Sequence, residues 1–179
     1  MGAAGDARAA SASCAGDGPP WVTIEIESPR LATSEALEFI EVDRTGCVTT
    51  RYGSMDVRAG TYRRPMDGAE RAALAGLIAA KGVDRLDANG LRKRIAAFDA
   101  ARAKSSPGAV SGVVVADGDL VRIAVDTGQR RNVVAWSGPV QEAALRPEAP
   151  ELGALAEFIV ALQATGADQR KQKIAEAGR

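Results

Sequence analysis

Residues 21–27 read Trp-Val-Thr-Ile-Glu-Ile-Glu, and this stretch decides the fold class. Val22, Ile24 and Ile26 share one face of an extended chain, and the polar side chains between them share the other face. A period of two is typical of a β-strand that is buried on one side only. The pattern therefore predicts a strand with one face against a hydrophobic core.

Two further strands are predicted after this one, at residues 37–43 and 47–52. Gly46 between them suits the positive φ of a tight turn, so the two strands should form a hairpin. Residues 55–57 and 60–64 are expected to continue the sheet as a short edge piece.

A second group of strands is predicted later in the chain, at residues 110–116, 119–126 and 131–136. Asp117 and Gly118 separate the first two of these strands, and an Asp-Gly dipeptide is a strong hairpin signal. Sequential strands joined by tight turns form an antiparallel meander.

Helices are predicted in three places where apolar residues recur at helical spacing. The clearest helix ends at Lys81. It is preceded by Asp67, and Glu70 three residues later completes the spacing of a capping box. A second helix with a basic surface is expected at about residues 90–104, and a third at about residues 151–164.

Strands and helices that occur in separate groups predict an α+β fold. The expected architecture is an antiparallel sheet from two strand groups with about three helices packed on one face. A single domain is expected over residues 21–166. It follows a disordered tail at residues 1–20 and precedes a frayed, charged tail at residues 167–179.

The composition argues against several common functions. Lysine plus arginine and aspartate plus glutamate each total 23, so no net charge attracts nucleic acid, and no nucleic-acid partner is expected. The chain has no histidine, so it cannot by itself build a Ser-His-Asp triad or a histidine zinc site. It also lacks a phosphate-binding loop and a dinucleotide fingerprint. We therefore expect no cofactor and no metal, and the balance leans away from an enzyme.

The two cysteines, Cys14 and Cys47, lack the spacing of a metal site. A disulfide between them would need an oxidising compartment and would attach the tail to the domain. Alternatively, the small residues at 11–13 resemble those before the acylated cysteine of a bacterial lipoprotein, although serine stands where leucine is usual. Cys14 is therefore also a candidate lipidation site. The third interpretation is an ordinary disordered tail.

The location of the protein follows from the same N-terminal residues. No stretch has the apolar length of a membrane span, and residues 1–20 contain no apolar core of a signal peptide. The sequence as written therefore predicts a cytoplasmic protein. An in-frame leader upstream would instead predict a periplasmic or envelope-anchored one.

The two tryptophans are candidate binding residues. Trp136 ends the last predicted strand, where it either lines a pocket or seals the end of the sheet. Trp21 opens the first strand on the face opposite Val22, and the same two interpretations apply to it.

Two arginine pairs complete the candidate binding residues. Arg63 with Arg64, and Arg130 with Arg131, flank predicted strand ends. On one sheet edge they would either bind an anion or act as charged gatekeepers against edge-to-edge pairing. The basic run at residues 92–94 is interpreted as a solvated helix face, with a phosphate or an acidic partner as the alternative.

The layout from Trp21 to about Gln163 resembles a diffuse group of uncharacterised small bacterial α+β domains, many of which follow a lipoprotein or secretory leader. The similar features are the first hairpin, the capped helix, the Asp117-Gly118 turn and the approach to the last helix at Pro150. This resemblance implies an envelope location, and such domains have no agreed activity.

Three functions remain as hypotheses. The first is a non-catalytic binding or protein-interaction domain with a protein partner. The second is a hydrolase that works without histidine and uses Glu25, Glu27, Asp117 and Asp119. The third is a self-associating structural module that forms a homo-oligomer through Trp21 or the last helix.

Overall fold

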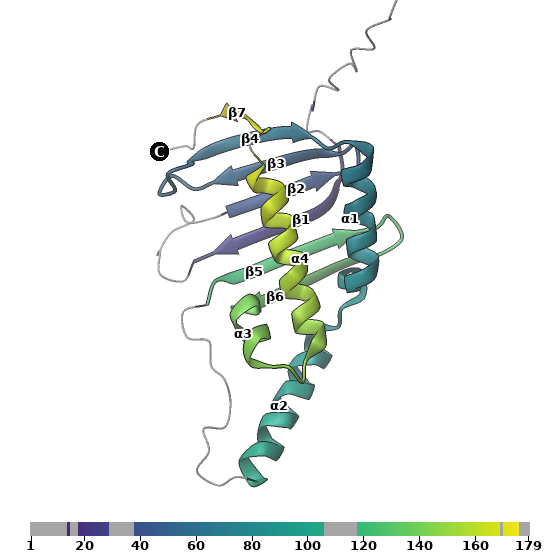
Figure 1. Ribbon diagram of the computed structural model, residues 1–179, viewed down its shortest axis with the longest axis vertical. Helices are drawn as coiled ribbons and strands as arrows, with labels where there is room; N and C mark the ends of the chain where they lie inside the picture. Colours follow the sequence, from purple (N-terminus) through teal and green to yellow (C-terminus); the bar gives the residue numbers. More distant parts are fainter. Residues whose placement is uncertain (1–13, 15–17, 29–37, 106–117, 169, 176–179) are drawn as a thin grey trace, which may run out of the picture.

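The alternating stretch that opens the domain forms an inner strand of an antiparallel sheet (Figure 1). The computed structural model describes residues 14, 18–28, 38–105, 118–168 and 170–175. Within them the sheet has seven strands in the order β6-β5-β1-β2-β3-β4-β7. In chain order these are β1 (Pro20–Glu27), β2 (Glu38–Asp43), β3 (Cys47–Tyr52), β4 (Gly60–Pro65), β5 (Leu120–Asp126), β6 (Arg131–Ser137) and β7 (Gln172–Ala175). The predicted α+β class and antiparallel sheet are confirmed.

β1 is the strand at which the two predicted strand groups meet. It pairs with β2 on one side and with β5 on the other, in antiparallel register on both sides. Ile24 of β1 lies opposite Ile40 of β2 and opposite Ile123 of β5, and all three side chains are buried. The two groups therefore share one sheet and one apolar row. The strand predicted at residues 110–116 and the turn residue Asp117 lie outside the described residues.

The β7 end of the sheet differs from the prediction. Residues 60–64, expected as an edge piece, form β4, but β7 pairs with β4 and takes the edge position. β7 belongs to the charged C-terminal segment that was predicted to be frayed, and the side chains of this short strand are all exposed. Residues 55–57 lie in the loop before β4 and not in a strand.

The helices in the described residues are α1 (Gly68–Lys81), α2 (Ala88–Ser105), α3 (Pro139–Leu145) and α4 (Pro150–Ala167), with a short 3-10 turn, η2 (Val83–Arg85). α1 and α4 lie side by side over one face of the sheet, whereas α2 extends beyond the β6 edge (Figure 1). The expected detail of about three helices on one face is therefore not confirmed. α3 is not among the predicted helices, although it begins at Pro139 and proline is well suited to the first position of a helix.

α1 begins and ends as its sequence predicts. The Asp67 carboxylate accepts a hydrogen bond from the Glu70 N–H at 2.8 Å, and the Glu70 carboxylate accepts one from the Asp67 N–H at 2.9 Å. This reciprocal pair is the predicted capping box. Gly82 ends the helix with a φ of 63°, in the left-handed region that glycine adopts without strain.

α4 packs the hydrophobic core against the sheet. Phe158 is fully buried at the middle of the helix. The helix was predicted at about residues 151–164, and it extends from Pro150 to Ala167. A Cβ at Gly166 would lie 2.6 Å from Cδ1 of Ile40, so the missing side chain lets the end of α4 approach β2 closely.

Cys14 and Cys47 form a disulfide, with their Cα atoms 5.3 Å apart. Cys47 is the first residue of β3, so the bond attaches the segment before β1 to the sheet. A sulfur in a disulfide carries no lipid. The lipidation of Cys14 stays a prediction, and it requires a molecule in which this disulfide is absent.

Removal of the disulfide should destabilise the domain. The bond spans 33 residues, and closing a loop of that size is expected to contribute about 2–4 kcal/mol. We expect Cys47→Ser to lower the free energy of unfolding by that amount in urea denaturation, and reduced wild type to match it. Equal stability of wild type and Cys47→Ser, or a lipid mass on Cys14 in intact-protein mass spectrometry, would contradict the prediction.

Candidate functional site

β6 is an edge strand whose outer side has no strand partner among the described residues. Backbone groups of successive residues in a strand point alternately to its two sides. The Gly138 N–H donates to Asp119 O at 2.9 Å, on the β5 side, whereas Ala135 O accepts a hydrogen bond from the Arg92 guanidinium, on the outer side. The residues whose N–H and C=O face outward are therefore Arg131, Val133, Ala135 and Ser137.

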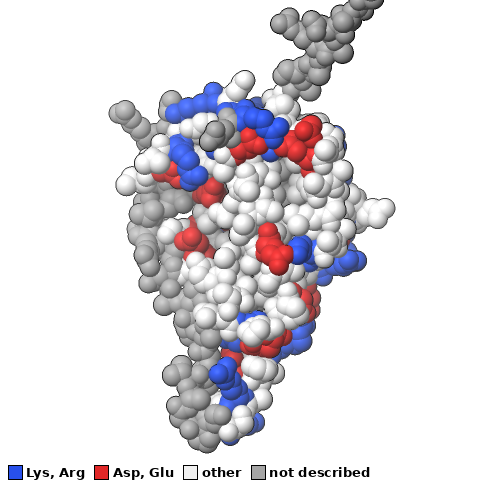
Figure 2. All heavy atoms as spheres, viewed as in Figure 1, with Lys and Arg blue, Asp and Glu red and all other residues white. Residues whose placement is uncertain are grey.

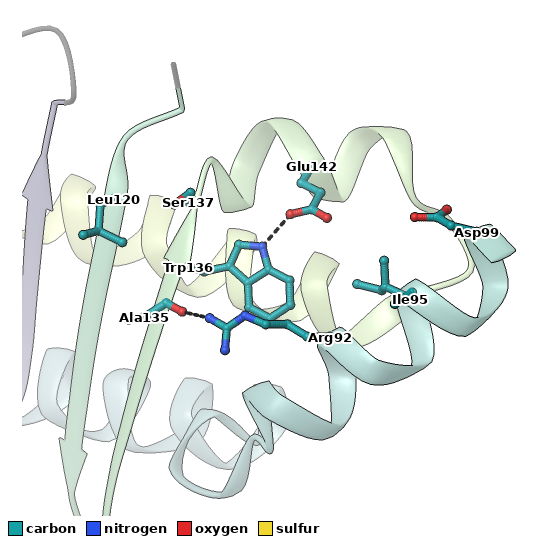
Figure 3. A pocket seen from close by; sticks show the side chains of 9 residues that line it. Arg92, Ile95, Asp99, Leu120, Ala135, Trp136, Ser137 and Glu142 are labelled. Carbon is teal, nitrogen blue, oxygen red and sulfur yellow. Dashed lines mark hydrogen bonds between the residues drawn. The ribbon is translucent and has the colours of Figure 1, made fainter. Parts of the chain in front are cut away.

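A groove separates this edge from α2. It consists of two hollows, one on each side of the Arg92 side chain, which reaches from α2 to β6 (Figure 3). The first hollow, of about 420 Å³, lies between α2, α3 and the end of β6. The second, of about 620 Å³, lies between residues 84–89 and the start of β6. We call the two together the edge groove, and its parts the Trp136 hollow and the arginine hollow.

Trp136 forms one wall of the first hollow. Its indole N–H donates to the Glu142 carboxylate at 2.5 Å, and the Arg92 guanidinium lies over the ring, 4.7 Å from its centroid (Figure 3). The side chain is only 5% exposed and packs in the hydrophobic core. The two interpretations of Trp136 are therefore compatible, because the ring seals the end of the sheet and also lines a hollow.

A buried arginine holds the Trp136 hollow in shape. Arg146 is 4% exposed and donates two hydrogen bonds of 2.9 Å to Asp99 of α2. It also donates to Glu142 of α3 at 3.0 Å and to Glu148 at 3.4 Å. These bonds tie α2 to α3, and they give each carboxylate of this hollow a cationic partner. The Arg146 hydrogen bonds lower the pKa of Asp99 against an opposing effect of burial.

The arginine hollow has a different charge balance. Four of its lining residues are arginines: Arg85, Arg92, Arg130 and Arg131. Its two carboxylates are Asp84 and Asp87. Neither Arg130 nor Arg131 forms an ion pair with any described residue. In the space-filling view, lysine and arginine gather over β4 and β7 and again along α2 (Figure 2).

The predicted arginine pairs do not share a sheet edge. Arg63 and Arg64 lie on β4, and four other strands separate β4 from β6, which Arg130 and Arg131 adjoin. That prediction is wrong because the chain returns through β5 on the far side of β1. Arg64 is also buried, and its guanidinium contacts Glu70 at 3.1 Å and Thr165 O at 3.4 Å. It serves to fix α1 and α4 on the sheet.

Trp21 is half-buried on the face of β1 opposite Val22, as its place in the strand predicts. Trp136 lies on the opposite, helix-covered face and is separated from β1 by β5. The two tryptophans therefore do not form one site.

The carboxylates of the hydrolase hypothesis are not gathered into a pocket. Glu25 and Glu27 both face Arg122, with their oxygens 3.9 Å and 2.7 Å from its Nη1. Both are partly exposed. Asp119 lies in the segment before β5, and Asp117 lies outside the described residues. Among the residues that the structure describes, no group of carboxylates or cysteines is placed to hold a metal ion.

The residues that shape the edge groove were largely missed by sequence reasoning. Arg92 was assigned to a solvated helix face, and Asp99, Glu142 and Arg146 were not considered. Their contacts join segments up to 47 residues apart, so no local spacing reveals them. Arg146 lies in no sequence motif that would indicate a structural role.

No family model, curated protein or solved structure matches this chain in the comparisons made. The likeness to small bacterial envelope domains therefore stays a prediction. No helix in the described part of the chain is long and apolar enough to cross a membrane.

Substitution of Arg146 should destabilise the domain strongly. Arg146→Met leaves three carboxylates, which are 15–25% exposed, without their buried partner, and breaking a fully buried ion pair in this way costs about 3–5 kcal/mol, which is the upper bound here. Arg122→Met is the matched control, because the Arg122 side chain is 47% exposed and its pairs are expected to contribute about 1 kcal/mol or less. Urea denaturation measures both. Equal losses in the two variants would contradict the structural role of Arg146.

The stability that Asp99 contributes should depend on pH. A carboxyl whose pKa is lower in the folded than in the unfolded state stabilises the fold above the unfolded-state pKa, and this is lost as the pH falls through the folded-state value. We expect Asp99→Asn to be less stable than wild type at about pH 7, and the gap to narrow toward about pH 2, below the unfolded pKa of about 3.9. Urea denaturation across this range tests it, and a constant gap would refute it.

Proposed function

We propose that this chain is a non-catalytic protein-interaction domain that binds an extended segment of a partner protein along the outer edge of β6. The observation that carries the proposal is the row of outward backbone groups on β6 that faces the edge groove. A peptide that adds a strand to such an edge gains main-chain hydrogen bonds, and adjacent pockets select its side chains.

The two edges of the sheet support this choice. β7 is a short edge with exposed side chains, and it includes Lys173, so it is protected in the usual way against strand addition. β6 is longer, keeps an unbroken register with β5 and has no bulge. Its central outward-facing residue is Val133, which is 59% exposed. β6 is therefore the edge better suited to receive a strand.

The groove also offers space for side chains. A segment paired with β6 would place alternate side chains on the helix side of the sheet, where the Trp136 hollow opens. The aromatic wall of that hollow suits an apolar or amphipathic side chain. The carboxylates beside it are engaged by Arg146 and by the indole, which supports binding rather than acid-base chemistry there.

The disulfide supports a location in an oxidising compartment. Cys14 and Cys47 are paired, and disulfides persist in secreted and envelope proteins while cytosolic thiols stay reduced. We therefore place the proposed interaction outside the cytoplasm.

A proline at position 133 tests the proposal. The Val133 N–H faces outward, so Val133→Pro removes a donor from the edge and leaves the bonds to β5 in place. Val133→Thr is the matched control, because it keeps the N–H. Peptides selected from a phage-displayed library of random linear peptides should bind Val133→Pro about tenfold more weakly than wild type. This is the change in affinity expected when one backbone hydrogen bond is lost and its acceptor on the peptide is left without a partner. Val133→Thr should bind nearly as well as wild type.

Two results would contradict the proposal, provided that circular dichroism shows both variants folded. Selected peptides that bind wild type and Val133→Pro equally would show that the edge is not used. A dimer in light scattering that Val133→Pro disrupts would show that a second copy of the chain, and not a partner protein, occupies the edge.

A further inference from the structure

The two hollows of the edge groove differ in free charge. In the Trp136 hollow, Asp99 and Glu142 share the single guanidinium of Arg146, so this cluster keeps a net negative charge and Arg146 has no charge left for a ligand. In the arginine hollow, Arg130 and Arg131 are exposed and form no ion pair with a described residue. An anion entering the groove would therefore find most of the unpaired positive charge at the arginine end, where Arg130 and Arg131 add to Arg92, which lines both hollows.

The carboxylates of the arginine hollow do not cancel this charge. Asp87 accepts a hydrogen bond from the Gly90 N–H at 2.9 Å, so its carboxylate caps the first turn of α2. Two carboxylates, Asp84 and Asp87, therefore face four guanidinium groups from η2, α2, the β5–β6 turn and β6, which leaves positive charge in excess. The N-terminus of α2 adds its positive dipole end at the same place.

The walls of the arginine hollow are fixed in position. The Asn132 side-chain amide donates to Val83 O at 2.8 Å and to Leu86 O at 3.2 Å. These bonds hold the segment before α2 against the start of β6, so the arginines from the two sides face a common space. Arginine suits such a site because its planar donor fork matches a carboxylate.

We propose that the arginine hollow binds an aspartate or glutamate side chain of the segment that pairs with β6. This inference rests on the proposed function and adds the chemistry of the partner, which is an extended acidic peptide. The acidic residues occupy the end of the groove near Arg130 and Arg131, and an apolar or amphipathic side chain occupies the Trp136 hollow.

Arg92 couples the anion to strand pairing. Its guanidinium occupies Ala135 O, an outward acceptor that an added strand needs. It also lines both hollows. A carboxylate in the arginine hollow offers this guanidinium a charged partner in exchange for the neutral carbonyl, and charge-assisted hydrogen bonds are the stronger kind. Arg92 thus acts as a latch, by which we mean that its hydrogen bond blocks Ala135 O until an acidic segment binds the guanidinium and frees this carbonyl.

Synthetic peptides test the acidic preference. The probe is an alternating Thr-Val peptide with two glutamates at one end, compared with the same peptide carrying two glutamines, by fluorescence polarisation. We expect the glutamate peptide to bind about tenfold more tightly. The double variant Arg130→Gln/Arg131→Gln should remove that difference, and Arg122→Gln, which does not line either hollow, should keep it.

The variant Arg92→Gln should change the affinities of the two peptides in different ways. We expect it to strengthen binding of the glutamine peptide, because Ala135 O becomes free, and to reduce the advantage of the glutamate peptide. A merely structural role of Arg92 would weaken both peptides alike, and that result would overturn the latch.

The outcomes separate this inference from the proposed function. If both peptides bind equally and Val133→Pro weakens both, the edge binds a strand and the acidic site is wrong. N-acetyl-triglutamate amide is too short to add a strand. If it shifts the backbone amide NMR signals of Arg130 and Arg131 while Val133→Pro affects neither peptide, the acidic site stands and the strand-binding function fails. Inorganic phosphate that displaces the glutamate peptide as effectively as triglutamate would overturn the assignment to an acidic side chain.

Discussion

The burial of Ile24 between Ile40 and Ile123 is the contact on which the rest of the structure depends. These residues come from the two strand groups and meet on β1, so the groups can bury their apolar faces only in one shared sheet. α4 then covers that row, and Gly166 allows its end to approach β2. β6 and β7 are then the two edge strands of the described sheet. The two edges differ in the segments and side chains that lie beside them.

The treatment of the β6 edge gives the domain its candidate site. α2 extends beyond β6 (Figure 1), with Leu91 and Ile95 buried in the hydrophobic core and Asp99 bonded to Arg146. A helix in that position neither pairs with the edge nor fills the space beside it. The edge groove lies between α2 and β6 because the helix is displaced beyond the strand. The Arg92 side chain crosses the groove and donates one hydrogen bond to Ala135 O. The Arg92 side chain thus covers a backbone acceptor of this edge, and a side chain can move away when a partner strand binds.

Local pattern was sufficient for most of the secondary structure. The alternation at Ile24 predicted β1, and the pair Asp67 and Glu70 predicted the start of α1, because strand faces and helix caps are decided by residues within a few positions of each other. The predictions that failed concern features that depend on residues far apart in the sequence. α4 was predicted to end at about residue 164, but it continues through Gly166, whose missing side chain allows close contact with Ile40 of a distant strand.

The candidate site was predicted only in part. The sequence by itself determined the class of fold, the half-buried strands and the absence of histidine, and it named Trp136 and Arg131, which line the edge groove. Only the tertiary structure decided that Arg63 and Arg130 lie far apart, that Cys14 bonds to Cys47, and that α2 stands off β6 to leave a groove. These features depend on strand order and on contacts between distant segments, and no periodicity within a segment encodes either of them.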